Sequence, residues 1–209
     1  MSKYLGPKCK LCRREGDKLM LKGERCSTAK CAIVKRNYPP GLHGPKGRSR
    51  QSGYSMQLRE KQKAKKIYNL MEKQFALSFE KALKQKGETG ENLMKILETR
   101  LDNVIYRLGF AASRAEARVL TNHGHFKVND IKVNIPSFSV KTGDVIKIKS
   151  SSQKSKPFAA LPEKLKKIEV PGWLNLDLKD LSAKVLSQPS KENFESKINN
   201  QMIVEFYSK

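Results

Sequence analysis

Residues 99–129 read TRLDNVIYRLGFAASRAEARVLTNHGHFKVN, and the changes of pattern within this stretch decide the fold class. Apolar residues repeat at helical spacing until Gly109 ends the helix. Ser113 and Glu116 then form a capping box, in which the serine oxygen accepts the Glu116 amide and the carboxylate returns to the serine amide. From Phe126 onward apolar residues alternate with polar ones, which predicts a strand. The order of helix, capped helix and strand predicts an α+β fold.

Helical spacing also covers most of the chain before this stretch. Apolar side chains repeat every three or four residues over 56–71 and again over 75–83. A third helix is predicted from about Glu91 to Leu108, and the tail, roughly 192–208, returns to the same spacing. We therefore expect residues 56–108 and the tail to be mostly helical.

Short strands are predicted after the capped helix, where the apolar period becomes two. Strands are expected at 126–128, 131–133 and 145–148, and another near 173–178. Residues 150–157, SSSQKSKP, have the composition of a surface loop. The sequence thus predicts a small, mostly antiparallel sheet.

The net charge of +23, from 43 Lys and Arg against 20 Asp and Glu, indicates a polyanionic partner. Residues 1–86 hold 23 basic and 6 acidic residues, while residues 87–209 hold 20 and 14. We therefore expect nucleic acid to bind most heavily on the first half. No apolar stretch approaches the roughly twenty residues that span a bilayer, and no secretory signal opens the sequence, so no membrane association is expected.

All four cysteines lie near the start, in the pattern Cys9-x2-Cys12-x13-Cys26-x4-Cys31. Without an export signal the compartment is expected to be reducing, so these thiols need a use other than disulfides. The spacing favours one structural zinc ion (Zn2+), closed by four thiolates with no position for a reactive water. Ordinary buried cysteines and an iron–sulfur cluster are the alternatives.

Several basic segments have the residue types that grip RNA phosphates and stack on bases. Residues 32–53 are expected to form an extended basic arm, because Pro and Gly preclude regular structure over most of it. A solvated charge run is the alternative for the arm, and ordinary surface charge for Arg114 and Arg118, which share a helix face. The candidate RNA-binding residues are Lys46, Arg48, Arg50, Tyr54, Arg59, Lys63, Lys66, Arg100, Arg107, Arg114, Arg118, His123, His125 and Lys127.

The sequence argues against two other function classes. The tripeptide Arg100-Leu101-Asp102 resembles the catalytic segment of pseudouridine synthases, but it falls within the predicted helix over 91–108 and too few residues follow it for a catalytic domain. The sequence contains no phosphate-binding glycine loop, no G-x-S-x-G and no H-E-x-x-H segment. A zinc-dependent DNA-binding regulator is disfavoured because the cysteines precede a Pro/Gly arm rather than a recognition helix. We predict that the chain is not an enzyme.

Longer motifs support a resemblance to one family. They are PPGLHG at 39–44, QLREKQKAKKIY at 57–68, EKQF at 72–75, TRLDNVIYRLGFAASRAEAR at 99–118, HGHFKVN at 123–129 and IVEFYS at 203–208. Over essentially all 209 residues the chain resembles the bacterial ribosomal protein S4 family, and its four-cysteine start resembles the zinc-containing branch.

The resemblance implies an α+β architecture in which a helical domain carries an inserted S4-type RNA-binding module of short helices packed on the small sheet. It implies a zinc-binding segment and basic arm at 1–45, a helical domain at 46–98 plus 183–209, and the S4 RNA-binding domain with a β extension at 99–182.

The resemblance also implies a structural constituent of the cytoplasmic small ribosomal subunit. Such a protein is a primary binder of the five-way junction in the 5′ domain of small-subunit ribosomal RNA, nucleates subunit assembly and contributes to translational accuracy. The implied neighbours are ribosomal proteins S5 and S3, and messenger RNA near the entry channel.

Two departures from the family pattern stand out. Asp130 occupies a position where the family usually has Gly, which is less favourable for a type I′ turn at 128–131. Val119 replaces a common glutamine, which puts a polar RNA contact there in doubt.

Overall fold

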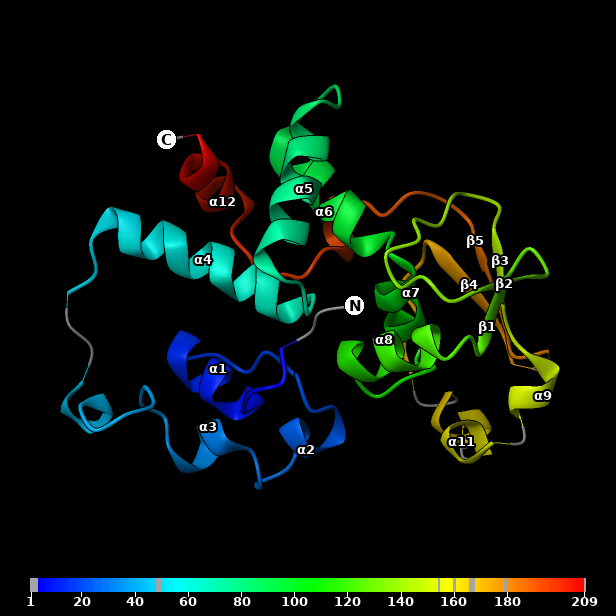
Figure 1. The fold of residues 1–209 in the computed structure, drawn as a ribbon, viewed down its shortest axis with the longest axis horizontal. Helices are drawn as coiled ribbons and strands as arrows, with labels where there is room; N and C mark the ends of the chain where they lie inside the picture. The colour runs from blue at the N-terminus through cyan, green and yellow to red at the C-terminus, as the bar shows by residue number, and fades with distance from the viewer. Residues whose placement is uncertain are drawn as a thin grey trace. The chain divides into compact units, whose positions relative to one another are not determined.

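The computed structural model divides the chain into two compact units, drawn together in Figure 1. The first unit comprises Met1–Leu93 and Glu195–Lys209, and the second comprises Met94–Phe194. The structure describes residues 4–47, 50–153, 155–159, 161–165, 168–178 and 180–208.

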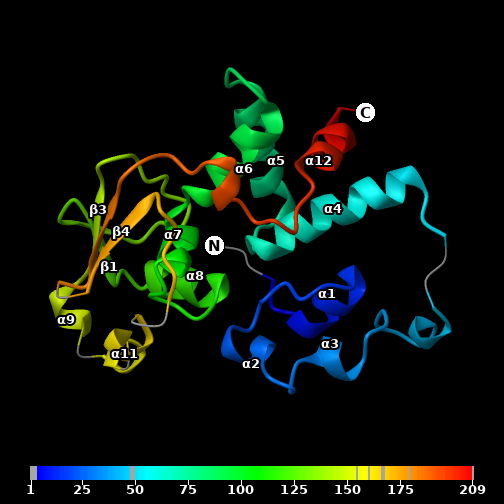
Figure 2. The ribbon, with the colours of Figure 1, turned by 180° about the vertical axis from the view of Figure 1, so that it is seen from behind.

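The first unit is helical and is closed by the C-terminal tail. Its main helices are α4 (Gly53–Ile67), α5 (Glu72–Leu83), the beginning of α6 (Thr89–Glu98) and α12 (Asn200–Tyr207). Helix α12 lies beside α4 in both Figure 1 and Figure 2. The Tyr207 ring stacks on Phe79 at 4.4 Å between centroids, and the Lys61 ammonium lies 4.8 Å from the Phe206 ring centre. Aromatic and cation–π contacts therefore fasten the tail to helices far away in the sequence.

The N-terminal segment of this unit contains more regular structure than expected. Its elements are α1 (Lys8–Glu15), α2 (Glu24–Ser27), α3 (Ala32–Lys35) and the 3-10 turn η1 (Gly44–Lys46). The predicted extended arm is therefore wrong at α3 and η1. Helix α3 forms because the Lys35 and Arg36 amides reach the carbonyls of Cys31 and Ala32.

The second unit packs helices on a five-stranded sheet of order β2-β1-β3-β5-β4, in which every pair is antiparallel. Alternate residues of the strands, such as Phe126 and Ile146, point into the core, which they share with Leu101 and Leu120 of two helices. The elements are α7 (Leu101–Arg107), α8 (Arg114–Asn122), β1 (Phe126–Val128), β2 (Ile131–Val133), β3 (Val145–Ile148), α9 (Ser150–Gln153), α10 (Lys156–Ala159), α11 (Leu161–Leu165), β4 (Leu174–Asp177), β5 (Ser182–Val185) and η2 (Lys191–Asn193).

The predicted combination of a helical domain and a small antiparallel sheet is confirmed, but details differ. Residues 150–157 are not simply a loop, because α9 and α10 form there. Strand β5 was missed, and its pairing with β3 draws residues 183–194 into the second unit. The three-part division at 45, 98 and 182 stays a prediction.

The single helix predicted over 91–108 is two helices, α6 and α7, and the pseudouridine-synthase-like tripeptide begins at the break rather than inside a helix. At Arg100 the backbone is extended and forms a bridge with Ser139. The Leu101 amide donates to the Phe138 carbonyl at 2.8 Å, and the Val140 amide donates to the Thr99 carbonyl at 2.9 Å. Tertiary backbone hydrogen bonds thus replace the helical ones that sequence periodicity predicted.

The hairpin between β1 and β2 forms despite Asp130. Asn129 and Asp130 have φ values of 49° and 63°, as a type I′ turn requires. The Asn129 amide group supports the turn by donating to Asp144 at 2.8 Å. Asparagine and aspartate tolerate this left-handed region better than most residues, so the missing glycine is accommodated.

Candidate nucleic-acid interface and cysteine cluster

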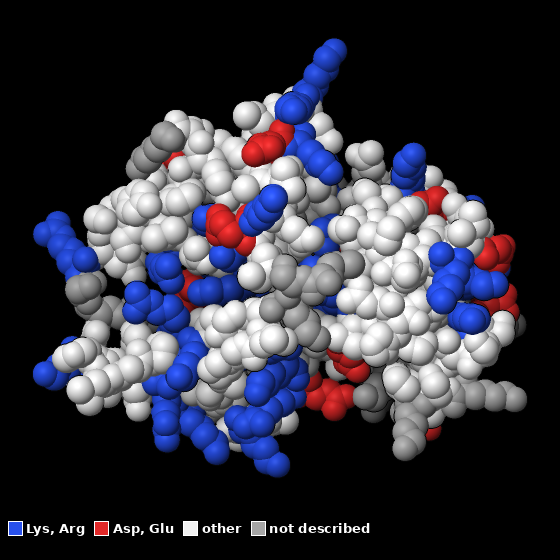
Figure 3. All heavy atoms as spheres, viewed as in Figure 1, with Lys and Arg blue, Asp and Glu red and all other residues white. Residues whose placement is uncertain are grey.

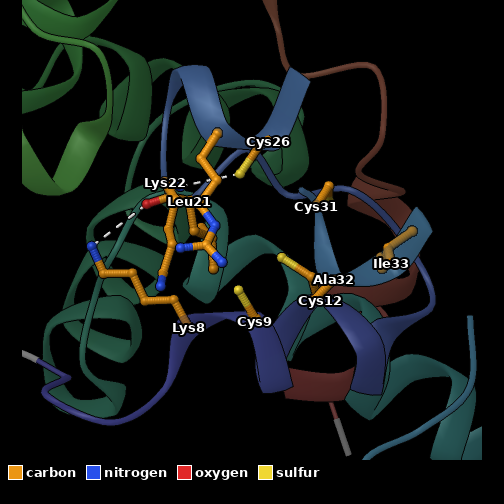
Figure 4. Close-up of a pocket in the computed structure, with 10 residues that line it drawn as sticks. Lys8, Cys9, Cys12, Leu21, Lys22, Cys26, Cys31, Ala32 and Ile33 are labelled. Atoms are coloured by element: carbon orange, nitrogen blue, oxygen red, sulfur yellow. Dashed lines mark hydrogen bonds between the residues drawn. The ribbon is translucent and has the colours of Figure 1, made fainter. Parts of the chain in front are cut away.

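The four cysteines line one small pocket, although they come from three different helices or their caps. Cys9 and Cys12 lie on α1, Cys26 on α2 and Cys31 caps α3. Figure 4 shows the sulfurs of Cys9, Cys12 and Cys26 pointing into the space between these helices, with Cys31 at its edge. The sequence spacing thus gathers the predicted ligands in one place.

The pocket has a volume of about 20 Å³, which is room for a single ion or water. Burial raises the pKa of the Cys12 thiol, and the neighbouring thiols raise it further. The Lys22 amide donates to the Cys26 sulfur at 3.3 Å, as amides do toward bound thiolates. Nevertheless, within the described part of the chain no group of three or more His, Cys, Asp or Glu side chains is already close enough to hold a metal.

A buried carboxylate fastens the cysteine segment to the helical unit. The Glu15 side chain is 2% exposed and accepts a hydrogen bond from Arg59 at 3.3 Å. Lys66 donates to the same oxygen. Two of the cations predicted to bind RNA are therefore used, at least in part, to hold α1 against α4.

The other predicted residues of the first unit differ in their freedom to reach RNA. Lys63 pairs with Glu60 at 2.7 Å, while Tyr54 is 55% exposed and its ring lies 5.7 Å from Phe206. Lys46 and Arg50 are exposed, and Arg48 lies outside the described residues. On the face drawn in Figure 3, Lys and Arg gather over the segment that precedes α4.

The four predicted arginines of the second unit have partners inside the protein. Arg100 and Arg118 are 6% and 2% exposed and lie beside the Asp102 carboxylate, at 3.0 Å and 3.9 Å. Burial lowers the pKa of Arg118, although the Asp102 charge counteracts this.

Arg107 and Arg114 belong to a second buried group around Asn103. Arg107 donates to Glu98 at 2.7 Å, and Arg114 donates to the Asn103 side-chain oxygen at 2.7 Å. Asn103 in turn donates to Glu98, which is fully buried. These contacts fix α7 and α8 relative to each other, so RNA contacts at the four arginines stay a prediction that this arrangement does not favour.

The capping box and the two histidines surround the ends of α8. The Ser113 oxygen accepts the Glu116 amide at 3.3 Å, while the Glu116 carboxylate accepts from Ala112 rather than from the serine amide. His123 is exposed, whereas His125 is half-buried and its Nδ1 lies 2.9 Å from the Ser152 hydroxyl. Burial lowers the pKa of His125, and the charges of His123 and Lys149 lower it further.

Strand register reveals basic residues that sequence reasoning missed. Lys127 lies directly opposite Lys132 on one neighbouring strand and opposite Lys147 on the other. We call these three residues the lysine row. Like charges directly opposite one another destabilise a sheet. Lys147 also lies 3.9 Å from the Asp130 carboxylate, so the charge of the row is partly compensated within the protein. Only the pairing register, which the sequence does not display, brings the three together.

Comparison with known proteins identifies the family. The model of the ribosomal protein S4/S9 N-terminal domain matches residues 3–98, and that of the S4 domain matches residues 99–146. A small ribosomal subunit protein uS4 from Caldicellulosiruptor saccharolyticus is 56% identical over 209 residues, covering 100% of both chains. The chain belongs to the ribosomal protein uS4 family. Further uS4 relatives, from Halothermothrix orenii and Acetivibrio thermocellus, are 53% and 52% identical over the same full length.

Membership of the uS4 family decides between the function classes left open by the sequence. The family is one of ribosomal proteins rather than enzymes, so the prediction of no catalysis is confirmed and the pseudouridine synthase alternative is wrong. No helix among the described residues is both long and apolar enough to cross a membrane.

Proposed function

We propose that this protein is a structural, RNA-binding constituent of the cytoplasmic small ribosomal subunit. The proposal rests on sequence identity above 50% to uS4 proteins over the full length of the chain, and the matches to both family models support it. The net charge of +23 and the exposed basic residues of both units fit a ribosomal RNA partner.

The family resemblance supports a finer proposal. The protein binds the five-way junction of the 5′ domain of small-subunit ribosomal RNA, nucleates assembly there and contributes to translational accuracy. Ribosomal proteins S5 and S3, and messenger RNA near the entry channel, are its proposed neighbours.

A second proposal is that one structural zinc ion sits among Cys9, Cys12, Cys26 and Cys31, as in the zinc-containing branch. Four thiols lining a pocket the size of one ion support it. Burial, and to a smaller extent the neighbouring thiols, raise the pKa of Cys12, and a bound cation would favour its thiolate against both. The ion would supply ordering free energy to a segment with few buried apolar residues.

Filter binding tests the RNA function. Wild-type protein should retain the 5′-domain RNA far better than duplex DNA of equal length at physiological salt. Equal retention of the two nucleic acids would contradict the proposal. Metal analysis of the purified protein tests the second proposal: one zinc per chain is expected, and Cys26→Ser should lower this content. Visible absorbance from a cluster would instead favour iron and sulfide.

A further inference from the structure

A polar pocket of about 250 Å³ lies between the cysteine segment, the Pro/Gly arm and the first turns of α4. Arg14 comes from α1, Arg50 precedes α4 and Arg59 lies on α4. His43 also lines it, and among the described lining residues there is no carboxylate. We call this space the Arg14 pocket.

One wall of the pocket depends on a glycine. Gly44 donates its amide to the Gly41 carbonyl at 3.1 Å, which closes the turn after Pro40. A Cβ atom at Gly44 would lie 1.9 Å from the Pro39 carbonyl oxygen, a distance that no side chain tolerates. The turn that forms this wall therefore packs closely and requires glycine at position 44.

Three consecutive residues of α1 build the pocket. Arg13 donates to the carbonyls of Tyr38 and Pro39 at 3.0 and 3.2 Å, so it holds the glycine-dependent wall. Glu15 accepts a hydrogen bond from Arg59 of α4. Arg14, between them, lies in the pocket lining. Since Arg13 follows Cys12 directly, the cysteine cluster and the pocket share one helix.

Two of the three arginines have no partner within the described part of the chain. Arg14 and Arg50 are exposed and make no hydrogen bond or ion pair to another described residue. Arg59, in contrast, has the Glu15 carboxylate. Uncompensated guanidinium groups facing one concave space attract a compact anion.

We infer that the Arg14 pocket binds one phosphate of the RNA backbone, and that the cysteine segment is the scaffold that positions Arg14 for it. Planar guanidinium groups bind phosphate oxygens bidentately, and such contacts fix the register of a protein on RNA without reading its sequence. The inference rests on the proposed ribosomal RNA function and adds Arg14 and His43 to the residues that the sequence indicated.

Binding to the 5′-domain RNA is measured for Arg14→Gln, Arg50→Gln and the double variant. Arg36→Gln is the matched control, because Arg36 is exposed in the same segment and is absent from the pocket lining. Each pocket variant should weaken binding about tenfold, as expected for a lost hydrogen bond to a charged group. The double variant should lose less than the product of the two single losses, because both arginines hold one phosphate. Arg36→Gln should change the affinity less than about threefold, because a single exposed charge is screened.

Each outcome has one meaning. If wild-type protein does not prefer the ribosomal RNA, the proposed function fails. If it does, and the pocket variants behave like Arg36→Gln, the pocket inference alone is overturned. Independent, multiplicative losses would place the two arginines on separate phosphates and would also overturn it. Circular dichroism and zinc content equal to those of the wild type show that each variant is folded, and Arg50→Gln breaks no contact within the described chain.

Inorganic phosphate distinguishes RNA from a free anion as the source of the phosphate group. Titration of wild-type protein should shift the amide resonances of Gly44 and Gly47, and the double variant should abolish these shifts. Phosphate should also compete with the RNA. If phosphate shifts these amides while the variants bind RNA normally, the pocket is a free-phosphate site and the RNA inference is wrong.

Discussion

Replacing Glu15 by Gln should loosen the cysteine segment from the helical unit. The Glu15 carboxylate is 2% exposed and faces two cations of α4, Arg59 and Lys66. Glutamine keeps the size of the side chain but removes the charge. The change therefore leaves two partly buried cations without their counter-charge, and that loss is electrostatic rather than steric.

The size of the effect follows from how deeply each partner is buried. Removing one member of a fully buried pair costs about 3–5 kcal/mol, whereas an exposed pair contributes about 0–1 kcal/mol. The Arg59 and Lys66 side chains are 27% and 14% exposed, so both regain some water when Glu15 is neutralised. We therefore expect a loss of roughly 2 kcal/mol, between these limits.

Amide hydrogen exchange across α1, combined with urea unfolding, measures this loss. Asp17→Asn is the matched control, because Asp17 pairs with Lys197 at 3.5 Å in the same segment but with both side chains more than a third exposed. That variant should lose less than about 1 kcal/mol. If Glu15→Gln cost no more than Asp17→Asn, the buried carboxylate would not be the anchor of α1.

Four further expectations concern RNA, metal and pH. The logarithm of RNA affinity should fall with the logarithm of salt concentration with a slope steeper than about −3, because each phosphate contact adds roughly −0.7 to −0.9; a shallower slope in filter binding would argue against an electrostatic interface. Chelating zinc should abolish amide protection before about residue 45 while α5 to α7 stay protected, and unfolding of the whole chain would contradict a local structural role of the metal. Chelation should also weaken RNA binding less in Arg14→Gln than in the wild type. Lys127→Thr should raise the free energy of unfolding by about 0.2–1 kcal/mol while weakening RNA binding, since it relieves like-charge pairs; a destabilised variant in urea would count against the lysine row. Burial raises the pKa of Glu72, but hydrogen bonds and charges from Lys61 and Lys65 outweigh it and lower the pKa below its ordinary value of 4.5. The contribution of Glu72 to stability is therefore full above pH 4.5 and is lost as the pH falls further. Amide exchange in α12 should show this loss, and Glu72→Gln should remove the pH dependence.

Local sequence patterns predicted the elements whose stability is decided locally. The periodicity around Phe75 and the alternation at Phe126 correspond to α5 and β1, and Ser113 caps α8 as its spacing indicated. Strand β5 was missed because its alternation spans only four residues, SAKV, with Ala183 and Val185 as its two apolar side chains. It forms because β3 and β4 supply hydrogen-bond partners on both sides.

The break between α6 and α7 shows the same limit. The helical spacing of apolar residues continues across Arg100, so the sequence pattern does not indicate that a helix ends there. The backbone leaves the helix there because residues 136–140, distant in sequence, accept and donate its hydrogen bonds. A pattern of side chains cannot report a backbone partner that lies some forty residues away.

The sequence gives the net charge of the chain, but it does not show which charged side chains are buried and which are exposed. The most deeply buried carboxylates, Glu15, Glu98 and Asp102, each face at least one arginine that the sequence marked as an RNA contact. An arginine held in this way is not available to a phosphate without leaving a carboxylate buried and unpaired, which costs several kcal/mol. We therefore expect RNA to contact cations that hold no buried carboxylate, such as Arg14 and the lysine row, although Lys147 of that row also lies 3.9 Å from Asp130. The arginines of the sequence motif around residue 100 therefore hold the helices of the second unit together, and we expect less conspicuous cations of both units to contact the RNA.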